Sequence, residues 1–375
     1  MLNRICFTEF AKQDCQTGIY QSEASFEREM YEKEQRSNAM IGGSMDRDGS
    51  AISMHGLTKK FGNLTAVDHV DLNIEKGELF GLLGPNGAGK STIIKMLTTM
   101  LKPTSGEARV WGYDAARDRN RVRSAIGVVF QDPAVDSMLT GRENLDFHGR
   151  MYGLSGALRK ERIKEVLELV DLTDKADVKL QDYSGGMQRR LEIARGLMHR
   201  PHILFLDEPT LGLDTQTRRH IWQYIRNLNR QEGVTIVLTT HYMEEADHLC
   251  NRVAIIDNGK IVAQDSPQNL KEMIGADTIT MDVLSGIDAL LSALQPFEWI
   301  KSATASGEMV ELRVDHAQSR VPQVMQEACR INATIRTVSL HEPTLEDVFL
   351  KFTGKKIRAA EGSVNPMQAM MHRRR

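Results

Sequence analysis

The sequence predicts an α/β core followed by a smaller α+β unit, and two observations support this prediction. Up to about residue 270, short apolar segments alternate with helical patterns, as the strands and helices of an α/β sheet do. After about residue 275 the order is strand, helix, strand, strand, helix, strand, which suits a ferredoxin-like unit. The expected core strands lie near residues 52–57, 70–75, 79–84, 126–130, 203–207, 234–239 and 252–256.

Four segments are expected along the chain. Residues 1–50 are polar and predict a disordered stretch or a mis-assigned extension, with the native start at Met40, Met45 or Met54. Residues 51–272 form the core, which includes a helix from Lys90 to about Met100 and a helical subdomain at about 135–195. Residues 273–355 form the C-terminal unit, and 356–375 a flexible tail. That unit is expected to hold strands at 278–283, 297–303, 309–314 and 333–340, with helices at 287–294, 316–329 and 345–353.

The composition of the chain narrows the possible partners and compartment. With 375 residues, 41% hydrophobic and 26% charged, it is typical of a globular protein. A net charge of -2 gives no reason to expect a nucleic-acid partner. No run approaches the ~18 apolar residues of a membrane span. The four cysteines lack metal-site spacing, which favours a reduced cytosolic compartment.

A glycine-rich segment follows the apolar residues 79–83 and opens a helical pattern. It fits the phosphate-binding P-loop, whose backbone N–H groups surround phosphate oxygens at a helix N-terminus. Lys90 is expected to reach the β- and γ-phosphates of a nucleotide, and Ser91 to ligate Mg²⁺. The plain alternative is a glycine turn before a surface helix. The motif reads Gly84-Pro85-Asn86-Gly87-Ala88-Gly89-Lys90-Ser91-Thr92.

Two carboxylates come directly after the apolar segment 203–206. Asp207 is placed to hold Mg²⁺ and Glu208 to polarise an attacking water, because α/β sheets bind ligands at the carboxyl ends of their strands. A turn capped by two acids is the plain alternative. The P-loop upstream favours the nucleotide site.

A second glycine motif precedes another helix. Ser184, Gly185 and Gly186 stand before apolar residues that share one helix face, namely Met187, Leu191, Ala194 and Met198. This predicts a second anion-binding helix start. Because the P-loop leaves only one face of a nucleotide open, a second anion site suggests closure by another subunit.

Tyr183-Ser184-Gly185-Gly186-Met187-Gln188 resembles the signature segment of ABC ATPases, usually written LSGGQ, with Tyr and Met in place of Leu and Gln. Further motifs of that family follow in order over about residues 52–270. Phe61 matches an adenine-stacking aromatic, Gln131 the Q-loop glutamine, the segment 211–214 the D-loop ending at Asp214, and His241 the switch histidine.

The resemblance implies a P-loop NTPase core of the ABC type that uses ATP and Mg²⁺. Glu208, His241 and Gln131 would be catalytic, and Ser91, Gln131 and Asp207 would contact the metal. The nucleotide would also touch Phe61, the P-loop, Asp214 and the segment Ser184-Gly185-Gly186.

The segments 140–145, 150–154 and 342–350 are similar to the daunorubicin/multidrug-resistance export type of ATP-binding subunit. This implies export of a drug, lipid or polysaccharide through a separate transmembrane permease, from the cytoplasmic face of the cell membrane. Two ATPase subunits would work together, either two copies of this chain as a homodimer or this chain and a paralogue. The C-terminal unit would help the subunits associate or regulate them, or its final helix would simply pack against the rest of the chain.

Three alternatives remain. A soluble ABC ATPase of ribosomes or DNA usually carries two cassettes or a long coiled coil, which this chain lacks. An importer subunit is disfavoured by segment 342–350, and a metabolic P-loop kinase does not explain Ser184 or His241.

Overall fold

The computed structural model describes residues 49–275 and 277–354. The predictions of an unstructured N-terminal segment and a flexible tail therefore concern residues that lie almost wholly outside the described ranges. The chain divides into Met1–Gly49 and Ser50–Arg375, and the fold described below belongs to the second unit.

An antiparallel sheet with the strand order β2-β1-β4-β5 begins this unit. Strands β1 (Ser50–Phe61) and β2 (Leu64–Glu75) form a long hairpin that includes the predicted segments 52–57 and 70–75. The short strands β4 (Ser105–Val110) and β5 (Tyr113–Asp114), together with helix α3 (Arg119–Ala125), were not predicted. Because the first half of β4 is exposed, its sequence lacks an apolar strand pattern. The buried face of this sheet packs with helix α2 (Lys90–Leu97).

A six-stranded sheet with the order β10-β9-β3-β8-β7-β6 forms the centre of the core. Strands β3 (Leu79–Leu83), β7 (Ile203–Asp207) and β8 (Thr235–Thr240) are buried along their whole length, as parallel strands covered on both faces are. Strand β6 (Ile126–Val129) pairs with β7, and β9 (Arg252–Asp257) pairs with β3, both in parallel. Strand β10 (Lys260–Asp265) pairs with β9 in the antiparallel sense. The carboxyl ends of β3, β7 and β8 therefore meet at one edge.

The predicted helical subdomain contains α4 (Gly141–Met151), α5 (Gly156–Leu169) and α6 (Gly185–Leu197), with two short 3-10 turns between α5 and α6. Helix α4 begins with a capping box, in which Thr140 and Glu143 satisfy each other's backbone N–H groups. The helices α7 (Thr215–Glu232) and α8 (Met243–Leu249) follow strands β7 and β8.

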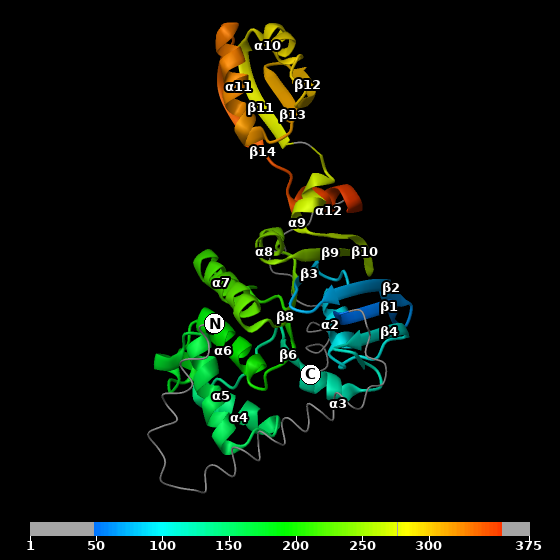
Figure 1. Cartoon of the computed structure of the whole chain (residues 1–375), viewed down its shortest axis with the longest axis vertical. Helices are drawn as coiled ribbons and strands as arrows, with labels where there is room; N and C mark the ends of the chain where they lie inside the picture. Colours follow the sequence, from blue (N-terminus) through cyan, green and yellow to red (C-terminus); the bar gives the residue numbers. More distant parts are fainter. Residues whose placement is uncertain (1–48, 276, 355–375) are drawn as a thin grey trace, which may run out of the picture. The chain divides into compact units, whose positions relative to one another are not determined.

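The C-terminal unit has the predicted order of elements. Its strands are β11 (Asp277–Ser285), β12 (Ile300–Ser306), β13 (Met309–Val314) and β14 (Thr334–His341), and its helices are α10 (Ile287–Leu294) and α11 (Ala317–Arg330). The strands form an antiparallel sheet with the order β12-β13-β11-β14, and the two helices lie along it (Figure 1). The βαββαβ order with this sheet confirms the expected ferredoxin-like unit.

Helix α12 (Leu345–Thr353) packs away from that sheet, although the prediction placed residues 273–355 in one unit. Its apolar residues Leu345, Val348 and Phe349 are buried in the same cluster as the core residues of α8 and of α9 (Pro267–Glu272). Figure 1 shows α12 beside α9, and the Lys351 ammonium donates to the Met273 carbonyl at 2.6 Å. The amphipathic stripe of α12 therefore covers the α/β core.

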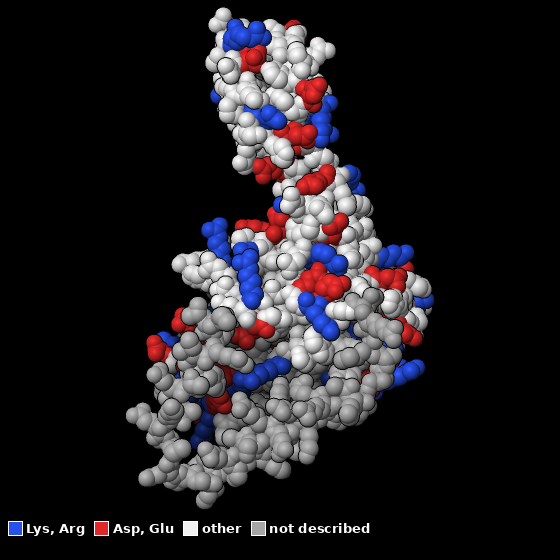
Figure 2. Space-filling model, in the orientation of Figure 1, with Lys and Arg blue, Asp and Glu red and all other residues white. Residues whose placement is uncertain are grey.

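Acidic and basic side chains are interspersed on the described part of the face in Figure 2, which agrees with the small net charge. Within residues 49–275 and 277–354, no helix is long and apolar enough to cross a membrane.

Candidate functional site

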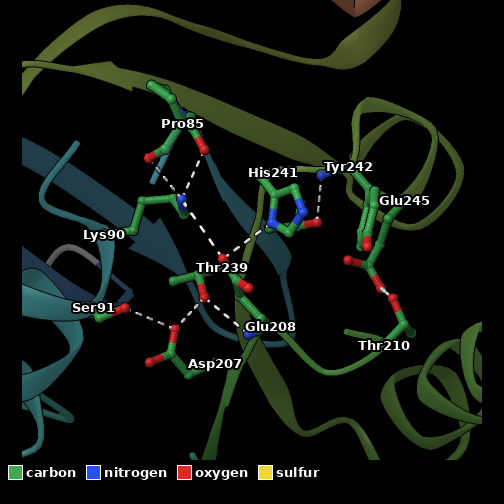
Figure 3. A network of polar contacts seen from close by, with 12 residues as sticks. Pro85, Lys90, Ser91, Asp207, Glu208, Thr210, Thr239, His241, Tyr242 and Glu245 are labelled. Atoms are coloured by element: carbon green, nitrogen blue, oxygen red, sulfur yellow. Dashed lines mark hydrogen bonds and ion pairs between the residues drawn. The ribbon is translucent and has the colours of Figure 1, made fainter. Parts of the chain in front are cut away.

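The predicted polar residues converge at the carboxyl edge of the six-stranded sheet. The P-loop follows β3, the acidic turn follows β7, and His241 follows β8 (Figure 3). Because these strands are neighbours, groups that lie far apart in the sequence come within contact distance.

The P-loop is held in a conformation that depends on its glycines. A Cβ on Gly84 would lie 2.2 Å from the Ile256 carbonyl oxygen, and Gly89 adopts a φ of 109° before α2 begins. The Lys90 ammonium is buried and donates to the carbonyls of Gly84 at 2.7 Å and Pro85 at 3.1 Å. Burial lowers the pKa of Lys90, and the negative charges of Glu208 and Asp207 oppose that shift. The loop thus holds a cation at the start of a helix, where phosphate groups bind.

Asp207 and Ser91 form a set of oxygen donors beside the P-loop. The Ser91 hydroxyl donates to Asp207 Oδ1 at 3.2 Å, and the Thr239 hydroxyl donates to the same carboxylate oxygen (Figure 3). Hydroxyl and carboxylate oxygens next to a phosphate site are the donors that Mg²⁺ prefers. The residues present therefore fit the metal that the sequence predicts.

Glu208 occupies a strained turn that fixes its carboxylate. Its φ is 48°, in the left-handed region, and its amide donates to the Thr239 carbonyl at 3.1 Å and hydroxyl at 3.0 Å. His241 Nδ1 lies 3.2 Å from Glu208 Oε1, and the Lys90 ammonium lies 3.9 Å from it. Burial alone would raise the pKa of Glu208, but the hydrogen bond and charge of His241 and the charge of Lys90 lower it below its ordinary value. The carboxylate is thus kept ionised and aimed at the P-loop side.

The glycine motif before α6 starts a helix, as predicted. Ser184 is exposed and caps α6 by accepting from the Met187 amide at 3.3 Å. Tyr183 is buried and donates its hydroxyl to the Lys175 carbonyl at 2.7 Å, so this departure from the usual Leu serves packing within the helical subdomain. Asp214 caps α7 by accepting from the amides of Gln216 and Thr217.

Two other predicted residues stay at the margin of the cluster. Gln131 is exposed just after β6, and among the described residues no hydrogen bond or ion pair joins it to the carboxylates. Phe61, at the end of β1, is 48% exposed, which leaves its ring accessible for stacking. The Lys59 ammonium lies 5.1 Å from the centre of that ring.

Several residues that support the site were not predicted. Thr239 bonds both acidic residues, and buried Arg189 of α6 donates to the carbonyls of the acidic turn. Glu245 of α8 is fully buried and accepts from Thr210 at 2.8 Å and Trp222 at 2.9 Å. For Thr239 and Glu245 the available signal was a polar or charged residue within a buried strand or helix, whereas Arg189 gives no such signal because it lies off the apolar face of α6.

Two family models match the chain. Residues 67–211 match the family described as ABC transporter. Residues 266–353 match the C-terminal domain of proteins described as ATP-binding protein DrrA1-3-like, in agreement with the predicted export-type resemblance.

Individual proteins with established names are similar over most of the chain. The linearmycin resistance ATP-binding protein LnrL of Bacillus subtilis (strain 168) is 39% identical, over 82% of this chain and 99% of that protein. The Nod factor export ATP-binding protein I of Rhizobium sp. (strain N33) is 40% identical, over 82% and 98%. A solved dimer of the ATP-binding cassette MJ0796, in a post-hydrolysis state with ADP and Pi, has a TM-score of 0.52 and 31% identity, over 57% of this chain and 98% of that one.

Proposed function

Because this chain belongs to the ATP-binding subunits of ABC transporters, we propose that it drives export through a separate membrane permease by hydrolysing ATP in a closed dimer. The observation that carries the proposal is the convergence of Lys90, Glu208 and His241 at the carboxyl edge of one sheet. A nucleotide with its γ-phosphate beside Lys90 would have Glu208 within reach of an attacking water.

Each group at that edge has a distinct part in the proposed reaction. Glu208, held ionised, accepts a proton from water as the water oxygen attacks the γ-phosphorus. The bond from that phosphorus to the β–γ bridging oxygen breaks, which leaves ADP and phosphate. Lys90 stabilises charge on the β- and γ-phosphates, and His241 orients both Glu208 and the γ-phosphate. Gln131 contributes to the placement of water from its exposed loop.

A magnesium ion would be held by Ser91 and Asp207, with Gln131 as a further oxygen donor. When bound, Mg²⁺ offsets the negative charge of the phosphates. The Thr239 hydroxyl and the Ser91 hydroxyl keep the Asp207 carboxylate directed toward the P-loop.

The second chain of the dimer is proposed to complete each site. Ser184 and Gly185 are exposed at the N-terminus of α6, where a phosphate group of the other subunit's nucleotide can bind. The dimeric state of the similar cassette supports this arrangement. Asp214 and the segment before it lie between the acidic turn and α7, and we place them at the same subunit boundary.

The helical subdomain is the proposed contact with the permease. Met138 before α4, and Phe147 and Met151 of α4, are 62%, 61% and 69% exposed. Large apolar side chains gathered at one helix favour contact with another protein. The permease would hold the subunit at the cytoplasmic face of the cell membrane.

The export direction rests on the relatives, whose names include linearmycin resistance and Nod factor export. We propose a drug, lipid or polysaccharide-like cargo, chosen by the permease. The ferredoxin-like unit is proposed to regulate the dimer or to assist its association, since it is attached to the core at both ends by α9 and α12.

The test uses a Glu208→Gln chain, which we expect to bind ATP normally and to lose turnover by at least ~10²-fold because the general base is gone. With ATP present, this variant should capture a polytopic membrane protein from native membranes in near-equal amount. Capture of ribosomal or DNA-repair proteins without a membrane partner contradicts the transporter proposal, and full turnover in the variant contradicts the role of Glu208.

A further inference from the structure

A buried ion pair in α6 connects segments of the site that are otherwise separate. Arg189 and Glu192 are 8% and 3% exposed, and Arg189 Nη1 lies 2.8 Å from Glu192 Oε2. Burying such a pair is costly unless its remaining donors and acceptors are satisfied. The other hydrogen bonds of the two side chains therefore show which segments the pair holds in place.

The Arg189 guanidinium holds the acidic turn from its carbonyl side. Its Nη2 donates to the carbonyls of Asp207 at 3.0 Å and Glu208 at 3.2 Å, and its Nε donates to the Pro209 carbonyl at 2.8 Å. Glu208, in the middle of these three, has the strained φ of 48°. Thr239 holds the same turn from its N–H side. The backbone that directs the Glu208 carboxylate is thus fixed on both sides.

The same ion pair holds both ends of the loop that carries Gln131. Arg189 Nη1 donates to the Phe130 carbonyl at 2.8 Å, directly before Gln131. Glu192 Oε1 accepts from the Ala134 amide at 3.0 Å, three residues after it. Both residues belong to the helix whose N-terminus carries Ser184.

We infer that Arg189, with Glu192, is a positioning residue that ties the Glu208 turn and the Gln131 loop to helix α6. The inference rests on the proposed function, because it assigns the alignment of that same site. A movement of α6 at its Ser184 end is thereby transmitted to Glu208, the proposed base, and to Gln131, which helps to place the water. The forked guanidinium is needed for this, because a lysine ammonium cannot donate at once to the carbonyls of the acidic turn and to the Phe130 carbonyl.

The experiment compares Arg189→Lys with Arg195→Lys in the full chain. Arg195 is a useful control because it also lies in α6 and is partly buried, and its guanidinium donates to the Val128 carbonyl at 3.4 Å; among the described residues no hydrogen bond joins it to the acidic turn or to the Gln131 loop. We expect Arg189→Lys to lower kcat at least ~10-fold, as small misplacements of reacting groups do, with the KM for ATP and the affinity for a fluorescent ATP analogue within about twofold. Arg195→Lys should leave kcat within about twofold.

A second arm tests whether the effect passes through Gln131. In a Gln131→Ala background, Arg189→Lys should reduce kcat by a smaller factor than in the wild type, because residues that act as a unit are not additive. If the lysine variant does not fold, Glu192→Gln carries the same prediction, since it replaces one carboxylate acceptor by a donor. Wild-type kcat in Arg189→Lys, or an equal loss in Arg195→Lys, overturns the inference. Full ATP turnover in Glu208→Gln would instead overturn the proposed function.

Discussion

Replacing Thr239 by valine removes a single hydroxyl from the centre of the site at constant volume. That hydroxyl donates to Asp207 Oδ1 and accepts from the Glu208 amide at 3.0 Å. The amide keeps a second acceptor, the Thr239 carbonyl at 3.1 Å. The loss therefore falls mainly on Asp207, whose Oδ1 then has, among the described residues, the Ser91 hydroxyl at 3.2 Å as its remaining donor.

The lost hydrogen bond to Asp207 sets the expected change in the free energy of unfolding. A hydrogen bond to a charged group contributes about 1.5–3 kcal/mol to folding, and Thr239→Val leaves no cavity, so the free energy of unfolding should fall by that amount. Thr239→Ser is the matched control: it keeps the hydroxyl and removes one buried methyl group, at about 1 kcal/mol. Turnover should separate the two variants more clearly, with at least ~10-fold lower kcat for valine and a change within about threefold for serine.

Urea unfolding followed by tryptophan fluorescence measures the free energy of unfolding of each variant. The chain has three tryptophans, of which Trp111 and Trp222 lie in the α/β core and Trp299 lies in the ferredoxin-like unit. A Trp299→Phe background makes the signal report the core alone. Equal unfolding midpoints and equal kcat for the valine and serine variants would refute the assigned role of the Thr239 hydroxyl.

Two further changes test other features of the core. Burial raises the pKa of Glu245 above its ordinary value of 4.5, although hydrogen bonds from Thr240, Thr210 and Trp222 oppose the shift. The unfolded chain therefore ionises at lower pH than the folded one, so stability falls as the pH rises through 4.5 toward the folded pKa. Glu245→Gln cannot ionise, and its melting temperature relative to wild type should increase between pH 4 and pH 8; a difference independent of pH contradicts this. Phe349→Ala on α12 should lower the stability of the core by about 3–5 kcal/mol, because Phe349 is 2% exposed, whereas Phe352→Ala, 42% exposed, should change it by less than about 0.5 kcal/mol. Matching unfolding curves for these two alanine variants would show that α12 does not stabilise the core.

The sequence was most informative where a local pattern has a single structural meaning. The P-loop needs no tertiary information, because its glycines and Lys90 are consecutive and open a helix. Strands β3, β7 and β8 were predictable because parallel strands buried on both faces are continuously apolar. The helix at 345–353 was predicted with its observed bounds from its cap and stripe.

The sequence was least informative where a residue acts through contacts far along the chain. Arg189 resembles a surface arginine in a helix, and only the packing of α6 against the acidic turn shows that it is buried. Strand β4 was missed because its exposed first half carries no alternation. The partner of α12 was also not predictable, since an amphipathic stripe indicates that a helix packs but not against which surface.

The packing of α12 against the core affects how this protein folds while the ribosome synthesises it. Helices α8 and α9 emerge well before α12, and the whole ferredoxin-like unit is synthesised in between. At ~5–20 residues per second, that interval lasts on the order of seconds. During it, Leu249 and Leu270 on the nascent chain lack the apolar cover that Leu345 and Phe349 later provide. The domain that begins synthesis first is therefore completed last, and the smaller unit has time to fold before it.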